Sequence, residues 1–357
     1  MKFIHVSNVN LGMEPFQSEH LTVDRNADMW NDFLRVVDLC GSEDVDVLFI
    51  TGTLFVRKPS LEELARLDER FLRLADTRVF FAPGVFPDGG DNSVYSEYPW
   101  KSNIHVFTGE SIQRIHVARL KMEVTGVGYL PRSWHKVKPF SLSRGRKGAV
   151  QVLLLPFFGD PSENASRSPE ELKSLPFDYI GVGQNAEYLS DNGNRVFAPG
   201  SFASAGFEDS ARHGYIFGTL EDDGHKRAAL RNQFVSMETR EYLEIRVNAH
   251  EEIRYQEVEE QVRNAIETYG TNHIYRILIS GASSPSLYIM KNNLYHLGNI
   301  FEVRDETDTD AVRKILMKGS EETAVTRFVD QVLSEEDSAV KQKAIQYGID
   351  ALLQEEQ

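Results

Sequence analysis

Short apolar runs recur along the first half of the chain, and their length and spacing restrict the possible folds more than any other feature of the sequence. Each run has the length of a buried strand, several end at glycine or proline, and helix-like segments separate them. The runs cover residues 3–6, 45–50, 79–82, 122–126, 150–155 and 179–182. Alternating strands and helices predict an α/β fold, in which helices cover a sheet and the loops at the strand ends carry the functional residues.

Two of the intervening segments have helix patterns. Residues 27–40 place apolar side chains at helical spacing, and the pattern ends at Cys40. Further on, Pro59 precedes a Ser60 to Glu63 segment that predicts a capping box at the start of a second helix. Local patterns therefore predict both the strands and the helices that an α/β fold requires.

The composition fits a folded protein without a membrane segment. The 357 residues are enough for two domains, and 41% of them are hydrophobic, which is enough for a sizeable core. No apolar run reaches transmembrane length, and the N-terminal segment lacks the basic flank and long apolar core of a signal peptide. Because the chain has one cysteine, which cannot form an internal disulfide, we expect a cytoplasmic protein.

The loops after the apolar runs carry a set of related motifs. The first run leads into Ser7-Asn8-Val9-Asn10-Leu11-Gly12, the second into Gly52-Thr53-Leu54-Phe55, the third into Pro83-Gly84-Val85-Phe86, and the last two into Pro156 and Gly183-Gln184-Asn185-Ala186. These motifs resemble those of the SbcD/YhaO-type DNA-repair exonucleases, in the calcineurin-like metallophosphoesterase superfamily. The family loops read S-D-x-H-L-G, G-D-L-F, P-G-N-H-D and Y-I-x-x-G-H-x-H. The resemblance implies a β-sandwich flanked by helices, with a small α+β capping domain.

The resemblance is lost at the metal ligands of this family. The family's ligand positions hold Asn8, Asn10, Thr53, Val85, Pro156, Gln184 and Ala186, and its catalytic histidine position holds Phe86. Two divalent cations about 3.5–4 Å apart require bridging carboxylates and imidazoles, and without them no bound water reaches a pKa near 7. Amides and a hydroxyl are weak substitutes, and the other side chains offer no ligand. The sequence therefore predicts no binuclear metal site, no metal cofactor and no catalysis of the family type.

Several of these polar residues have a structural interpretation. Asn8 and Asn10 can stabilise the turn after the first strand, because asparagine tolerates left-handed backbone conformations and bonds nearby backbone groups. Thr53 follows a glycine and can cap a turn. His5 lies inside an apolar strand, where a hydrogen-bonded core histidine is expected.

A rearranged metal site is the alternative. Acidic residues and a histidine lie beside the former ligand loops and could, together with Asn8, Asn10 or Gln184, hold a single Mn²⁺ or Mg²⁺ ion. The residues available are Asp88, Asp91, Asp160 and His213. Aspartates in glycine-rich loops are, however, common turn formers.

The net charge argues against a general attraction to DNA. The formal charge is -15, and nucleic-acid binding depends on lysine and arginine neutralising phosphates. A local basic segment with interleaved aromatic residues covers 132–147 and is the candidate for phosphate or nucleic-acid contacts. Its basic residues are Arg132, Lys136, Lys138, Arg144, Arg146 and Lys147. Solvated loop charge is the alternative meaning of such a segment.

The later part of the chain resembles the family more loosely. We expect a strand pair around 212–220 and 228–235, then a strand at 242–247, a helix at 253–268, a strand at 274–280, and a connection to helices at 310–315, 323–333 and 340–353. The resulting domains are a metallophosphoesterase-like domain at 1–238, a capping domain at 239–320 and a C-terminal helical segment at 321–357. In the family that segment docks on the coiled coil of an SMC-like ATPase of the SbcC or YhaN type.

Three functions follow from these observations. The first is a catalytically inactive homologue that acts as a scaffold or partner of an SMC-like ATPase, and the resemblance also implies a possible homodimer through the helices of residues 55–74. The second is a metal-dependent DNA exonuclease or phosphodiesterase with a rearranged, weaker metal site. The third is a module that binds a ligand or nucleic acid in the altered cleft, where amides could hydrogen-bond and Phe86 could stack on a base.

Overall fold

The computed structural model has two compact units, which are described separately. The larger unit contains Met1–Pro15 and Asp24–Thr239, and the smaller contains Phe16–Val23 and Arg240–Gln357. Within them the structure describes residues 1–13, 20–21, 23–74, 76–84, 93–108, 112–127, 143–157, 172–183, 187–190, 195–209, 211–222, 227–250, 252–282, 287 and 290–308.

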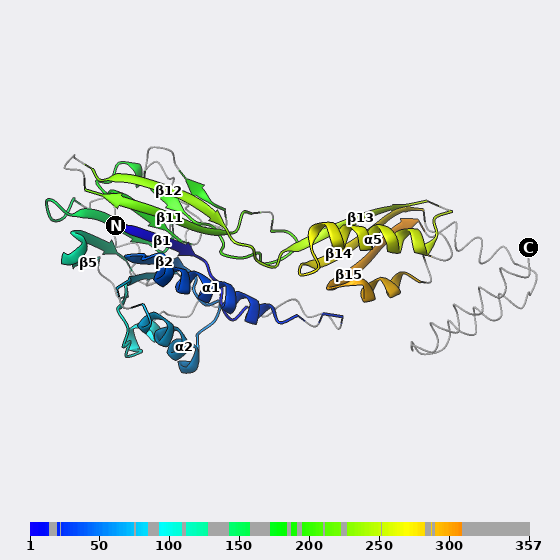
Figure 1. The fold of residues 1–357 in the computed structure, drawn as a ribbon, viewed down its shortest axis with the longest axis horizontal. Coiled ribbons are helices and arrows are strands. Elements are labelled where there is room, and N and C mark those ends of the chain that lie inside the picture. The colour runs from blue at the N-terminus through cyan, green and yellow to red at the C-terminus, as the bar shows by residue number, and fades with distance from the viewer. Residues whose placement is uncertain are drawn as a thin grey trace, which may run out of the picture. The chain divides into compact units, whose positions relative to one another are not determined.

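The first sheet of the larger unit has six strands in the order β12-β11-β1-β2-β3-β4. They are β1 (Lys2–Ser7), β2 (Val47–Gly52), β3 (Arg78–Pro83), β4 (Ile104–Val106), β11 (Gly214–Glu221) and β12 (Ala229–Ser236). Strands β1 to β4 are parallel, whereas β11 and β12 form an antiparallel hairpin beside β1 (Figure 1). The C-terminal ends of β1, β2 and β3 therefore lie together along one side of the sheet. We call this side, where the strands end, the C-terminal edge.

Helices α1 (Arg25–Ser42) and α2 (Leu61–Leu72) pack on one face of this sheet, and the short α3 (Ser93–Glu97) follows β3. The Asp24 side chain caps α1 by accepting a hydrogen bond from the Ala27 N–H. The predicted capping box is confirmed: the Ser60 side chain accepts from the Glu63 N–H, and the Glu63 carboxylate accepts from the Ser60 N–H. Side chains from both helices fill the core over the sheet, including Phe33, Val37 and Phe71.

The second sheet also has six strands, in the order β5-β6-β7-β8-β10-β9. They are β5 (Gln113–Val117), β6 (Met122–Gly126), β7 (Val150–Leu155), β8 (Tyr179–Val182), β9 (Leu189–Ser190) and β10 (Val196–Ala198), with the 3-10 helix η1 (Ala118–Leu120) between β5 and β6. Its inner face packs against the uncovered face of the first sheet through one buried cluster that includes Phe3, Phe49, Leu154 and Tyr179. All six apolar runs are strands, and the predicted α/β class is confirmed.

The smaller unit is a three-stranded parallel sheet in the order β13-β14-β15. Its elements are β13 (Tyr242–Ala249), α5 (Tyr255–Tyr269), β14 (Ile274–Ala282), the 3-10 helix η4 (Lys291–Leu297) and β15 (Ile300–Asp308). Apolar residues of α5, such as Val258 and Val262, pack on Ile245 and Ile277 of the sheet.

The strand β15 corrects the sequence analysis, which expected a connection to C-terminal helices after residue 280. Its sequence, IFEVRDETD, has three apolar residues near the start and five charged residues. One cross-strand ion pair joins it to β14: Arg276 Nε lies 3.0 Å from the Glu302 carboxylate. Acidic residues have low strand propensity, so the sequence pattern alone does not predict this strand. The helices expected at 310–315, 323–333 and 340–353 lie outside the described residues. Among the described helices, none is long and apolar enough to cross a membrane.

Candidate functional site

The loops after β1 and β2 run side by side beyond the ends of the strands. The backbone N–H groups of Asn10 and Leu11 donate to the carbonyls of Thr53 and Leu54, at 3.2 and 2.8 Å. Leu11 and Phe55 then form an isolated parallel bridge. The first two motifs of the sequence analysis are thus held against each other by backbone hydrogen bonds.

Left-handed backbone conformations shape these loops. Asn8 and Asn10 have φ of +48° and +58°, and Gly52 has φ of +77°. Asparagine and glycine are the residues that adopt this conformation at low energy. The side-chain oxygen of Asn8, which is 6% exposed, accepts a hydrogen bond from the Thr53 N–H at 3.3 Å. Both asparagines therefore have the backbone geometry expected of turn residues, and Asn8 also bonds the neighbouring loop.

The second sheet meets the first at this edge. A Cβ atom placed on Gly183 would lie 2.2 Å from the Gly52 backbone nitrogen and 2.6 Å from the Pro156 carbonyl oxygen, so only glycine fits there. Close by, the Gly84 N–H donates to the Gly52 carbonyl at 2.9 Å. The ends of β2, β3, β7 and β8 consequently converge around one point.

A further loop joins the same edge from residues 199–202. The Ser7 hydroxyl donates to the Gly200 carbonyl at 2.6 Å, and the Phe202 N–H donates to the Asn8 carbonyl at 3.2 Å. Gly200 has φ of +88°, which again favours glycine. Of the family's ligand positions, the structure describes Asn8, Asn10, Thr53 and Pro156, each at a strand end of this edge. Val85, Phe86, Gln184 and Ala186 lie outside the described residues.

The described side chains do not fit a divalent metal ion. Asn8 and Thr53 are nearly buried and neutral, and Pro156 has no side-chain ligand. Within the described parts of the chain, no three His, Cys, Asp or Glu side chains lie close enough together to hold a metal ion. Such a cation needs anionic oxygens or imidazoles to offset its dehydration. The proposed substitutes Asp88, Asp91 and Asp160 lie outside the described residues.

His213 is described and is held within its own loop. Its Nδ1 lies 3.1 Å from the Ser201 carbonyl oxygen, which can only accept, so Nδ1 donates. Its Nε2 lies 3.6 Å from Asp209, whose carboxylate accepts from the Ala205 and Ala211 N–H groups at 3.0 and 3.1 Å. His213 therefore orders the 201–213 loop together with Asp209.

A buried polar chain connects the two sheets beneath this edge. The ring nitrogens of His5 lie 2.8 Å from the Tyr179 hydroxyl and 2.8 Å from the Thr51 hydroxyl. Burial lowers the pKa of His5 to about 3, so the imidazole is neutral at ordinary pH. His5 is the hydrogen-bonded core histidine that the sequence predicted, although its two partners were not anticipated.

The described part of the basic segment forms a structural ion pair. The Arg144 guanidinium donates to both carboxylate oxygens of Asp178, at 2.9 and 3.3 Å, and the Asp178 side chain is fully buried. Asp178 also accepts from the Gln151 and Ala228 N–H groups, at 2.8 and 3.0 Å. Arg146 and Lys147 are exposed. The other candidates for phosphate contact, Arg132, Lys136 and Lys138, lie outside the described residues.

Comparison with known proteins gives no family assignment: no family model and no curated protein matches the chain. Among solved structures, the chain is similar to GAP50, the anchor in the inner membrane complex of Plasmodium, with 13% identity, a TM-score of 0.41, and coverage of 66% of this chain and 84% of that one. It is also similar to TT1561 of Thermus thermophilus, with 11% identity, a TM-score of 0.35, and coverage of 65% and 98%. At these identities and TM-scores, neither likeness assigns a function.

Proposed function

We propose that this chain is a catalytically inactive protein of the SbcD/YhaO type with a calcineurin-like metallophosphoesterase fold, and that it acts as a scaffold or partner of an SMC-like ATPase. Two observations support the fold. The strand-end motifs match the order of the family motifs along the chain, and the described motifs meet at one edge of two packed sheets.

The side chain of Asn8 carries the argument for lost catalysis. In the family this position is a metal-binding aspartate, whereas here it is a neutral amide whose oxygen accepts the Thr53 N–H across the two loops. The same edge retains the glycines and left-handed residues that shape the loops. The residues that shape the loops are present, whereas metal-binding side chains are absent from the described part of the site. This combination favours a binding or scaffold role over catalysis.

Metal binding and hydrolysis test this proposal together. Calorimetric titration with Mn²⁺ should give no binding heat, and the protein should cleave neither DNA nor bis-p-nitrophenyl phosphate. The matched comparison is a variant with Asn8→Asp, Asn10→His and Thr53→Asp, which restores three family ligands on loops that already lie together. Stoichiometric Mn²⁺ binding by the natural sequence, with metal-dependent cleavage, would contradict the proposal and favour the rearranged enzyme.

The ATPase partnership rests on the resemblance and needs its own test. The natural protein should co-purify with the coiled-coil segment of an SMC-like ATPase from the same genome, and a truncation that removes residues 321–357 should not. Failure to bind that segment, or equal binding by the truncated protein, would count against the assigned docking segment.

A further inference from the structure

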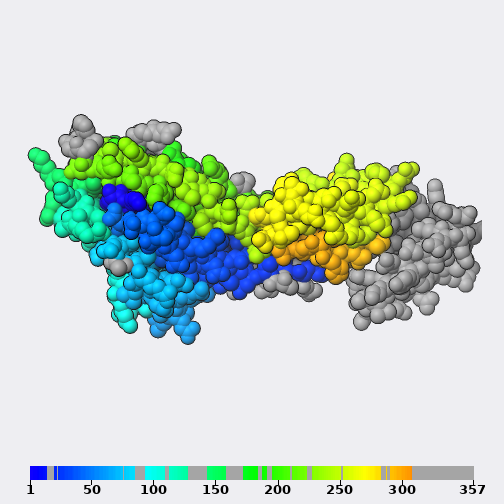
Figure 2. All heavy atoms as spheres, in the orientation of Figure 1, coloured from blue at the N-terminus to red at the C-terminus, as the bar shows by residue number. Residues whose placement is uncertain are grey.

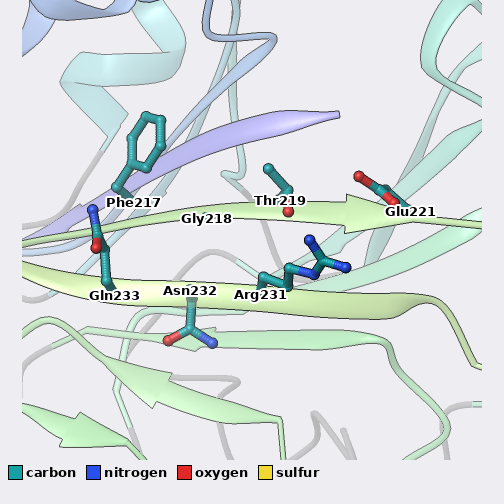
Figure 3. A pocket seen from close by; sticks show the side chains of 7 residues that line it. All are labelled: Phe217, Gly218, Thr219, Glu221, Arg231, Asn232 and Gln233. Carbon is teal, nitrogen blue, oxygen red and sulfur yellow. The ribbon is translucent and has the colours of Figure 1, made fainter.

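A pocket opens on the hairpin of β11 and β12, with a volume of about 360 Å³ (Figure 3). The residues that line it are Phe217, Gly218, Thr219, Glu221, Arg231, Asn232 and Gln233. Thr219 also pairs with Lys2, the first residue of β1, so the pocket lies at the opposite end of β1 from the C-terminal edge. A ligand bound in this pocket would therefore be separate from the strand-end loops.

Side chains from three neighbouring strands form two rows on the face that carries the pocket. Lys2, Thr219 and Arg231 form the first row, because Thr219 pairs with Lys2 on one side and with Arg231 on the other. Phe217 and Gln233 pair with each other and belong to the next row. Rows two residues apart along a strand are separated by about 6.8 Å. Figure 2 shows the hairpin in green at the surface, beside the N-terminal residues in dark blue.

The first row supplies hydrogen-bond donors and positive charge for an anion. Arg231 is exposed, and its guanidinium makes no hydrogen bond or ion pair within the described part of the chain. By contrast, Arg195 near the same hairpin donates to two backbone carbonyls, at 3.1 and 2.7 Å. Lys2 Nζ donates to the Glu43 carbonyl at 2.9 Å and has two further N–H groups. Two cations beside the Thr219 hydroxyl form a combination that suits phosphate.

The second row offers a surface for a planar ring. Phe217 is half-buried against the core, and the Gln233 amide lies beside its ring (Figure 3). An aromatic ring can stack on a nucleobase, and an amide can both donate to and accept from the base edge. Glu221 lies on the other side of the first row, where its carboxylate repels additional anions. The pocket therefore suits one ring and one phosphate better than a polyphosphate chain.

We infer that this pocket binds a nucleoside monophosphate, with its base on Phe217 and its phosphate between Lys2 and Arg231. One ribose joins the base to the phosphate and spans the separation between the two rows. The backbone pairing of β1, β11 and β12 fixes the spacing of these groups before the ligand binds. In a protein whose formal charge is -15, this group of cations also provides a local attraction for an anion.

Calorimetric titration of the full chain with AMP tests the ligand class. The natural protein should bind AMP at one site. Adenosine lacks the phosphate and inorganic phosphate lacks the ring, so each should bind at least about tenfold more weakly. ATP should also bind more weakly than AMP, because Glu221 repels the additional phosphates. AMP that does not bind, or that binds no more tightly than adenosine, phosphate or ATP, would overturn the inference.

Substitution of Arg231 tests the location of the site. Arg231→Gln removes the cation from an exposed side chain and should weaken AMP binding by about tenfold or more. Arg73→Gln is the matched control: this arginine is 59% exposed at the end of α2, and its loss removes the same charge from the larger unit. The control should bind AMP with the affinity of the natural protein. Equal affinities of Arg231→Gln and the natural protein would reject this pocket as the site.

Chemical modification locates the ligand in the natural protein. Phenylglyoxal reacts with exposed arginine side chains, and mass spectrometry of the peptides measures the rate at each position. Bound AMP should slow the modification of Arg231 and leave that of Arg73 unchanged, because only the first guanidinium is covered by the phosphate. An unchanged rate at Arg231 in the presence of saturating AMP would contradict the inference.

Discussion

His5 shows how burial determines the chemistry of a single residue. An exposed histidine has a pKa near 6.5, but this imidazole is completely buried between two hydroxyl groups and next to aromatic rings. Gly181 makes room for it, since a Cβ there would lie 2.8 Å from the His5 ring. The ring therefore acts as a neutral connector between the two sheets, and protonation would place an unpaired charge in the core.

The first prediction concerns the pH dependence of stability. Between about pH 6.5 and about pH 3 the unfolded chain binds a proton at His5 that the folded chain does not, so the free energy of unfolding falls as pH decreases. The limiting slope is ~1.4 kcal/mol per pH unit. In urea unfolding at a series of pH values from about 7.5 to about 5, the free energy of unfolding should fall more steeply below about pH 6.5 than it does for His5→Gln, with the difference in slope approaching this limit. Equal slopes in the two proteins would show that His5 does not contribute.

At the scale of secondary-structure elements, Asp178 connects segments that are distant in the sequence. It lies immediately before β8, and its carboxylate bonds the backbone of β7 and the residue that precedes β12. Arg144 supplies the compensating charge from the loop before β7. Removing the Arg144 cation would leave the buried carboxylate charge uncompensated, which is strongly destabilising.

The second prediction is that Arg144→Ala lowers the free energy of unfolding by about 3 kcal/mol, because it leaves the buried carboxylate without its cation. The value is at the low end for such pairs, since the Arg144 side chain is 32% exposed. Arg146→Ala is the matched control: this exposed arginine lies in the same loop, and its substitution should change stability by less than about 0.5 kcal/mol. Chemical denaturation measures both variants, and equal effects would contradict the structural role of Arg144.

At the scale of the whole molecule, the two units have separate hydrophobic cores. The smaller unit packs α5 and η4 on its own sheet, and the larger unit has clusters on both faces of its first sheet. Units with separate cores can unfold separately, and a single melting temperature is then not defined for the whole chain.

The third prediction is that Val258→Ala destabilises the smaller unit by about 2 kcal/mol and leaves the larger one unchanged. Val152→Ala, at an equally buried position of the larger unit, should have the opposite selectivity. Hydrogen exchange followed by mass spectrometry assigns each change to its unit. A change spread across both units after either substitution would show that they unfold as one.

Local sequence patterns predicted a large part of this fold. The six apolar runs, the helix ending near Cys40, the capping box at Ser60 and the turn geometry of Asn8 and Asn10 all depend on side chains a few residues apart. Short-range sterics, capping and hydrophobic periodicity act within that distance, so they can be recognised in the sequence.

Long-range pairing decided the rest. β15 is a strand because β14 supplies its backbone pairing and the Arg276–Glu302 ion pair, and the Asp178 carboxylate is stabilised because Arg144 and two backbone segments surround it. The sequence by itself determined the strands and helices of the first half of the chain and the neutral side chains of the described strand-end loops. The tertiary structure alone decided which polar groups satisfy each other, because this depends on contacts between residues far apart in the chain.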